Sequence, residues 1–169
     1  MSPELPSPTT PPSARQELFL AYLDYFRETL VDRVAGLEEH ERRESRLPSG
    51  WTPLQLLHHL RHVERRWLVW GFEGEPVPDP WADAVQGRWH VDPGLGLVEL
   101  AAALREQGEV TRAVVGRHDL TEAGRPGPRW DGAPPATLER VLFHLLQEYA
   151  RHAGHLDVVA ELAGGAVGE

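Results

Sequence analysis

Apolar residues recur every three or four positions in four separate stretches of the chain, which is the spacing of an amphipathic helix. The pattern predicts a first helix from Ser13, a suitable N-cap, to about Leu37. A second helix is expected to begin at Thr52 and to continue to about Phe72. A third should cover residues 97–115, and a fourth should begin at residues 136–137 and end before Gly164.

The predicted helices imply an all-α fold, an antiparallel four-helix bundle with long loops after its second and third helices. These loops, residues 73–94 and 120–135, are rich in proline and glycine. The first exceeds the usual connection length, and such loops are often functional or cover a site. Three loop tryptophans either pack or line the mouth of a pocket: Trp81, Trp89 and Trp130.

The start of the chain has a different composition from the rest. Proline, serine and threonine dominate residues 1–12, which predicts a disordered leader. Residues 13–165 should then form a single domain. No strand pattern, internal repeat or glycine-rich phosphate loop occurs in the sequence.

Charge and hydropathy narrow the possible partners. The formal net charge of −9 argues against binding to nucleic acid. No apolar run is long enough to span a bilayer, and the start lacks the basic and apolar regions of a signal peptide. We therefore expect a cytoplasmic protein that binds neither nucleic acid nor membrane.

Several residue types are missing from the chain. Because there is no cysteine, a metal site must use nitrogen and oxygen ligands, and a thiol nucleophile must come from another molecule. Lysine, isoleucine and asparagine are also absent. Since their codons are rich in A and T, the source genome is expected to have a very high G+C content, as in an actinobacterium.

The fourth predicted helix carries the main candidate chemistry. At roughly 100° per residue, His144, Glu148, His152 and His155 fall within an arc of about 80° that borders the apolar face. Such groups are costly to bury unpaired, and a bound metal ion would satisfy them. Glu148 and His152 are one turn apart, which suits two ligands of one ion, although a Glu–His surface pair is the alternative.

The second predicted helix carries three histidines, and a helical histidine is most often solvated or hydrogen-bonded. His58 and His62 are one turn apart and could form a local pair. His59 instead continues an apolar stripe and is expected to face the core. The stripe consists of Leu56, His59, Val63 and Trp67.

An inward His59 opposite Glu148 and His152 would complete a three-ligand set. Two nitrogens and one carboxylate oxygen are the ligands of an open catalytic zinc site. His144 and His155 could be outer partners of these ligands, or one of them could replace Glu148.

Two motifs resemble a known family. Residues 51–53 (Trp-Thr-Pro), followed by Leu-His-His-Leu at 57–60 and Val-Glu at 63–64, resemble the second helix of the DinB/YfiT-like metal-dependent four-helix proteins. The stretch 148–157, Glu-x-x-x-His-Ala-Gly-His-Leu-Asp, resembles their fourth-helix motif. Glutamate at its first position is similar to the branch that includes mycothiol-dependent maleylpyruvate isomerases and related thiol S-transferases.

The resemblance implies His59, Glu148 and His152 as ligands of a divalent metal, with zinc expected and nickel or iron possible. His59 is favoured over His58 because Leu60 completes the family's His-Leu pair. Mycothiol is the implied thiol cosubstrate, or bacillithiol in another organism. His155 or His144 would carry the proton. The family often forms homodimers, which makes a homodimer possible here.

The resemblance therefore predicts a metal-dependent thiol S-transferase, or a hydrolase, that acts on a small electrophilic substrate. The isomerases carry a further C-terminal domain and this chain ends after its fourth helix, so the isomerase reaction itself is not expected. Two alternatives stay open. One is a non-catalytic metal- or ligand-binding bundle protein of a stress response, and the other is a bundle whose histidines bind no metal.

Overall fold

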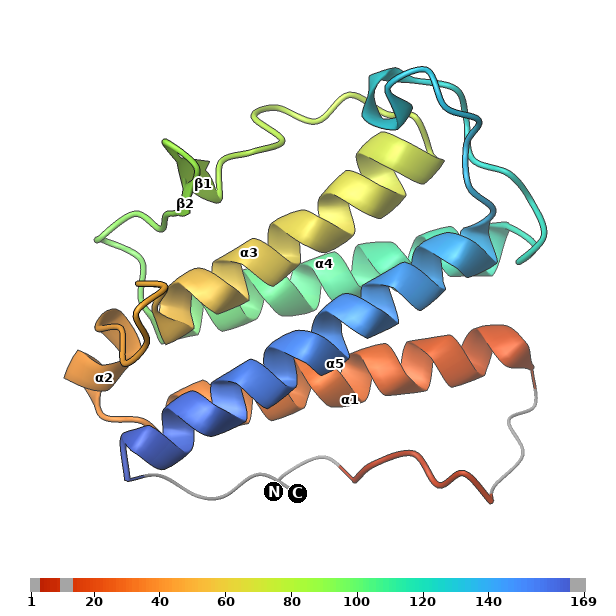
Figure 1. The fold of residues 1–169 in the computed structure, drawn as a ribbon. Helices are drawn as coiled ribbons and strands as arrows, with labels where there is room; N and C mark the ends of the chain where they lie inside the picture. The colour runs from red at the N-terminus through yellow and green to blue at the C-terminus, as the bar shows by residue number, and fades with distance from the viewer. Residues whose placement is uncertain (1–3, 10–13, 165–169) are drawn as a thin grey trace.

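The computed structural model describes residues 4–9 and 14–164, and helices dominate it (Figure 1). Its long helices are α1 (Arg15–Ala35), α3 (Pro53–Arg65), α4 (Leu97–Arg117) and α5 (Leu138–Leu162). The π-helical turns of Arg66–Phe72 continue α3 to Phe72, where the sequence pattern predicts that the second helix ends. The predicted all-α four-helix bundle is confirmed.

Two expectations concern residues near the start of the chain. Ser13, the expected N-cap of the first helix, lies outside the described residues. The predicted disorder of residues 1–12 also falls partly outside them, and it stays a prediction. Residues 4–9 form coil and a turn. The Tyr22 hydroxyl of α1 donates a hydrogen bond to the Pro6 carbonyl oxygen at 3.3 Å.

Threonine side chains cap the starts of α3 and α5. Thr52 Oγ1 accepts the Gln55 N–H at 3.3 Å, and Gln55 Oε1 accepts the Thr52 N–H at 3.0 Å. This reciprocal capping box satisfies two backbone donors that the first turn of a helix leaves free. Pro53 occupies the first helical position, and Thr137 accepts the Arg140 N–H at the start of α5.

Helices α1 and α5 lie side by side and run in the same direction (Figure 1). Arg15 and Glu139 form an ion pair where both helices begin. Arg33 and Asp157 form a second pair, at 3.0 Å, near their ends. The two helices therefore start at the same end of the bundle.

Helices α3 and α4 are also parallel to each other. Arg43, ahead of α3, donates to the Leu95 carbonyl just ahead of α4, and Glu73 after the π-helical turns pairs with Arg117 at the end of α4. The long connection after α3 must therefore return along the whole bundle before α4 begins. The α1/α5 pair runs antiparallel to the α3/α4 pair. Because the consecutive helices α3 and α4 are parallel, the direction of the chain does not reverse from every helix to the next.

Short elements that the apolar pattern did not predict lie in the connections. They are the helix α2 (Glu39–Arg43), the strands β1 (Ala84–Val85) and β2 (Arg88–Trp89), and a 3-10 turn (Pro128–Trp130). The strands form a hairpin whose turn residues, Gln86 and Gly87, both have positive φ angles of 51° and 75°. A two-residue turn of this kind matches the twist of the strands and favours glycine. Two-residue strands are too short to show an alternating pattern.

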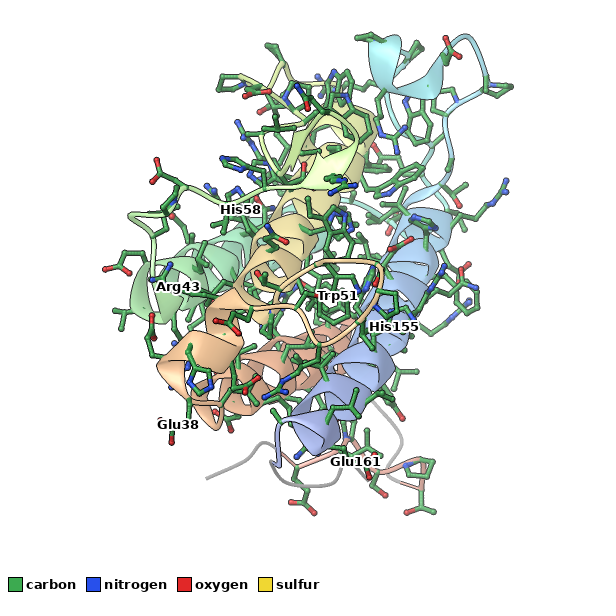
Figure 2. The ribbon with its side chains drawn as sticks, turned by 60° about the vertical axis from the view of Figure 1, so that its left-hand side comes forward. Glu38, Arg43, Trp51, His58, His155 and Glu161 are labelled. Carbon is green, nitrogen blue, oxygen red and sulfur yellow. The ribbon has the colours of Figure 1, made fainter. Side chains whose placement is uncertain are left out.

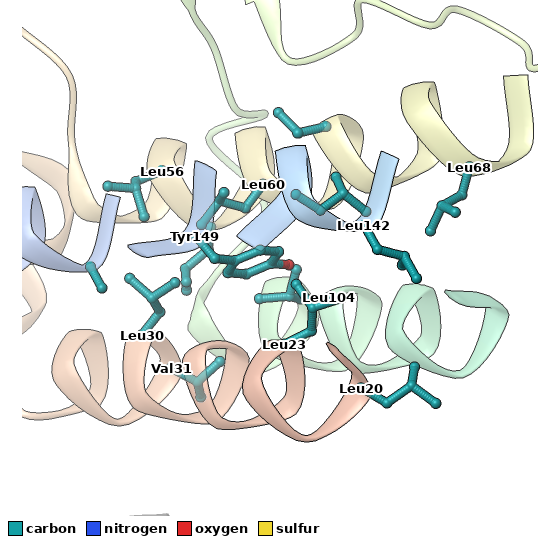
Figure 3. Packing of buried hydrophobic residues seen from close by; sticks show 14 of the residues in the cluster. Leu20, Leu23, Leu30, Val31, Leu56, Leu60, Leu68, Leu104, Leu142 and Tyr149 are labelled. Carbon is teal, nitrogen blue, oxygen red and sulfur yellow. The ribbon is translucent and has the colours of Figure 1, made fainter. Parts of the chain in front are cut away.

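The core fills the space between the four helices with aliphatic side chains around one buried tyrosine, Tyr149 (Figure 3). Leucines supply most of it, from every long helix. Fully buried examples are Leu23, Leu30, Leu56, Leu57, Leu60, Leu104, Leu142 and Leu145. Each contributes about 1.5–3 kcal/mol when removed from water.

A buried polar network crosses this core, with one residue from each long helix. Arg27 of α1 donates to Glu64 of α3 at 2.7 and 3.1 Å, and Thr111 of α4 and Tyr149 of α5 donate their hydroxyls to the same carboxylate. Gly108 lies against the guanidinium, where a Cβ would come within 3.1 Å of Arg27. The carboxylate is thus fully satisfied in a place that water does not reach.

Candidate metal centre

His59, Glu148 and His152 come together midway along the bundle. His59 lies on α3, and the other two lie one turn apart on α5. One potential ligand atom from each residue lies within 4.8 Å of the others. His152 is buried, whereas His59 and Glu148 are half-buried. Among the described residues this is the one group of three whose side chains could hold a metal ion.

His59 is oriented by an aspartate that the sequence patterns did not reveal. Its Nδ1 lies 2.8 Å from Asp83 Oδ2, and Arg66 donates to both oxygens of Asp83 at 2.5 and 3.1 Å. A carboxylate only accepts hydrogen bonds, so Nδ1 carries the proton and the Nε2 lone pair stays free. This is the tautomer that a metal-binding histidine held by a carboxylate adopts.

The protonation states of these groups suit metal binding. Burial lowers the pKa of His59, even though Asp83 opposes that shift, so the imidazole is neutral near pH 7. The imidazole of His152, 3.4 Å away, lowers the pKa of Glu148, which is therefore ionised. Burial alone would raise the pKa of Asp83, but the hydrogen bonds from His59 and Arg66 hold it well below its usual range.

His58 and His62 lie outside this cluster. Both side chains are buried, and their rings meet edge-on with centroids 4.6 Å apart, as the predicted local pair requires. Burial lowers the pKa of both imidazoles, that of His62 to about 4. Of the three histidines on α3, His59 is the one that faces α5. The centroid of its ring lies 5.4 Å from that of His152.

Aromatic rings enclose the centre on the side of the long loop. Trp89 of β2 stacks on the His59 ring, with centroids 4.2 Å apart and the planes tilted by 20°, and its ring lies 5.3 Å from that of His152. Trp51 packs 5.9 Å from Trp89. Stacking covers the face of the imidazole and leaves its in-plane lone pair free. The other loop tryptophans pack elsewhere, Trp81 under the Arg66 guanidinium and Trp130 near Trp67.

Comparison with known proteins decides the family. The family model for mycothiol-S-transferase matches residues 18–165. The chain belongs to the mycothiol-S-transferase family. This confirms the resemblance to the DinB/YfiT-like proteins and supports a thiol S-transferase function. No curated protein matches the chain. Across the described residues, no helix has the length and apolar character needed to cross a membrane.

The two further histidines of this mycothiol-S-transferase family member flank the centre along α5. His144 Nε2 lies 3.6 Å from Glu148 Oε1, and its ring packs against Trp67 at 4.5 Å. His155 lies on the other side, with its ring 5.6 Å from that of His152. Its side chain is exposed, and partial desolvation and the neighbouring His152 lower its pKa. Both therefore lie just outside the three central residues.

The donor set of the centre fits a divalent ion. Two imidazoles and one carboxylate are typical protein ligands of an open zinc site. The 3.4 Å between His152 Nε2 and Glu148 Oε2 is close to the ~3.3 Å that separates two ligand atoms around a tetrahedral zinc ion. The described part of the chain thus offers His59, Glu148 and His152 as ligands, with Asp83 as the partner of His59.

Replacing Asp83 by asparagine is expected to weaken zinc binding about 10- to 100-fold, as loss of such an outer partner does. The neutral amide loses its ion pair with Arg66 and holds His59 less firmly. Competition with a chromophoric chelator measures the affinity. Asp79→Asn, an exposed position in the same loop, is the matched control and should bind zinc normally. Equal affinities for the two variants would remove Asp83 from the centre.

Proposed function

We propose that this chain is a metal-dependent thiol S-transferase that joins mycothiol to a small electrophilic substrate. The observation that carries the proposal is the meeting of His59, Glu148 and His152 in one cluster, in a member of the mycothiol-S-transferase family. Zinc is the ion that this ligand set fits best, and nickel and iron also accept imidazole and carboxylate ligands. Three protein ligands leave a coordination position for a further group.

A bound ion would lower the pKa of the thiol, so that the thiol would ionise near neutral pH. The chain has no cysteine, which is why the sulfur must belong to the cosubstrate. We assign His155 as the acceptor of the thiol proton, because it is exposed and its lowered pKa keeps it neutral. The sulfur then forms a bond to the electrophilic carbon, and a leaving group departs with the electron pair of the broken bond.

The remaining groups would keep the ligands in place. His144 contacts Glu148 and holds the carboxylate from the side opposite His155. Asp83 fixes the tautomer of His59, and Trp89 covers the imidazole face and limits access of water. Such a preorganised arrangement costs little reorganisation when charge develops on sulfur.

Metal removal tests the proposal. The zinc-loaded protein is mixed with mycothiol and 1-chloro-2,4-dinitrobenzene, and the thioether product is followed by absorbance. We expect catalysis that returns to the uncatalysed rate after chelation and recovers when zinc is restored. Glutathione in place of mycothiol is the control for a general thiol effect.

Two other outcomes would assign a different function. Substrate loss at the same rate without mycothiol, with a hydrolysis product, would make the chain a hydrolase, since water would then take the place of the thiol. A protein that holds zinc but accelerates neither reaction across a panel of electrophiles would be a non-catalytic metal-binding bundle.

A further inference from the structure

A cavity of about 380 Å³ opens between the loop ahead of α3 and the β1–β2 hairpin. Its volume is within the range of pockets that bind small organic molecules. The cavity adjoins the candidate centre in two ways. Gln55, which lines it, lies one turn ahead of His59 on α3, and Trp89, which also lines it, stacks on the His59 ring.

Two tryptophans are among the residues that line the cavity. Trp51 and Trp89 stand 5.9 Å apart between centroids, with their planes tilted by 50°. Trp51 also approaches His155 of α5, at 6.5 Å, and Figure 2 shows the two residues beside each other. Indole faces bind flat rings through stacking and through burial of apolar surface. A flat aromatic molecule is therefore the shape that these walls favour.

The polar groups of the cavity are mainly hydrogen-bond donors. Arg88 lines it, and the guanidinium has no ion pair with any residue that the structure describes. The carbonyl oxygen of the Gln55 side chain is used by the Thr52 N–H, which leaves its amide N–H groups available. Among the lining side chains, the Ser49 hydroxyl and the second lone pair of the Gln55 oxygen can also accept.

Charge strengthens this preference. The chain has a formal net charge of −9, which would repel an anion from most of its surface. Arg88 places a positive charge on the cavity that adjoins the candidate centre. A guanidinium binds a carboxylate through charge-assisted hydrogen bonds, which are stronger than neutral ones.

We propose that this cavity binds a flat aromatic carboxylate, with its ring against the indoles of Trp51 and Trp89 and its carboxylate on Arg88 and Gln55. The inference rests on the proposed function, because such a molecule with a leaving group on its ring would be the electrophilic substrate: sulfur would bond to the ring carbon and the leaving group would depart with the electron pair. Its ring would lie next to His59 and His155, where the thiol and the proton acceptor are placed.

Binding of 2-naphthoate tests the proposal, with 2-naphthamide as the uncharged match and cyclohexanecarboxylate as the anion without a flat ring. The protein is labelled with 15N, and the indole N–H signals of its six tryptophans are followed by NMR. Trp51→Phe and Trp89→Phe variants assign two of these signals. We expect naphthoate to shift these two most, and both comparison molecules to bind about tenfold more weakly.

The Arg88→Gln variant should lose about tenfold in affinity for naphthoate and little for naphthamide. Arg140→Gln, an exposed arginine outside the cavity, is the matched control and should bind both molecules as the wild type does. Equal affinity for naphthoate and naphthamide, shifts centred on other tryptophans, or no binding would each overturn the proposal.

Naphthoate binding and thiol transfer activity are both measured on zinc-loaded and chelator-treated protein. The two measurements distinguish failure of this proposal from failure of the proposed function. Naphthoate binding in the cavity without any thiol transfer activity would leave the cavity assignment in place and remove the transferase. Thiol transfer to other electrophiles without naphthoate binding would remove the cavity assignment alone.

Discussion

After reconstitution with zinc, the His152→Ala variant is expected to hold no metal, and the wild type is expected to hold about one divalent ion per chain. Removing one of three protein ligands should cost more affinity than the roughly 10- to 100-fold lost with an outer partner. His152 is also the most buried of the three, so water cannot easily replace its imidazole. Elemental analysis of both proteins after reconstitution with zinc gives the answer.

Arg151→Ala is the matched control for this experiment. Arg151 is the neighbour of His152 on α5, and its side chain is exposed. The Arg151→Ala protein should keep its metal, and both variants should retain the helical circular dichroism of the wild type. Zinc retained by His152→Ala would remove this residue from the ligand set. A reconstituted wild type without metal would remove the metal centre, leaving a helical bundle whose histidines bind no ion.

The second large effect is on stability. Arg27→Met is expected to lower the free energy of unfolding by about 3–5 kcal/mol, the cost of leaving a buried charge without its partner. Glu64 is fully buried and accepts two hydrogen bonds from Arg27. Burial opposes a charged guanidinium, but the attraction of Glu64 outweighs it and raises the pKa of Arg27 further. Urea denaturation followed by circular dichroism measures the change.

Two further variants separate charge from packing. Arg105→Met removes an exposed ion pair with Glu28 and should cost less than about 1 kcal/mol. The double variant Arg27→Met/Glu64→Gln should recover much of the loss, because glutamine is neutral, and its oxygen can accept from one of the Thr111 and Tyr149 hydroxyls while its NH2 group donates to the other. An Arg27→Met protein no less stable than Arg105→Met would contradict a stabilising role for the network.

The helices themselves are local features, and the sequence patterns predicted them well. The apolar period of each helix reflects burial of one face, and Thr52 and Thr137 cap α3 and α5 through hydrogen bonds within one turn. The π-helical turns at Arg66–Phe72 extend the second helix to the residue where its period ends. Information of this kind lies within a few neighbouring residues, so it can be read without the tertiary fold.

Parts of the candidate centre could also be predicted. The spacing of Glu148 and His152 by one turn places both on one face of a single helix. The apolar stripe through Leu56 and Val63 turns His59 toward the core and away from the His58–His62 pair. Whether these three side chains meet on one ion depends on the register of α3 against α5, which no local pattern contains.

Other features depended on contacts between distant segments. Asp83 contacts His59 although the two residues are 24 positions apart in the sequence. Asp83 lies in the long loop that connects the parallel helices α3 and α4, and the position of this loop follows from that pairing. The Arg27–Glu64 pair links α1 to α3, and each residue alone looks like a solvated charge on a helix.

The sequence by itself thus determined the helices, the family and a short set of candidate ligands, because periodicity and motifs are properties of adjacent residues. Only the tertiary structure decided the parallel pairing of the helices, the carboxylate that orients His59, and the tryptophan that stacks on it. The physical reason is that packing brings together groups far apart in the chain, and their desolvation and pairing energies arise only at contact.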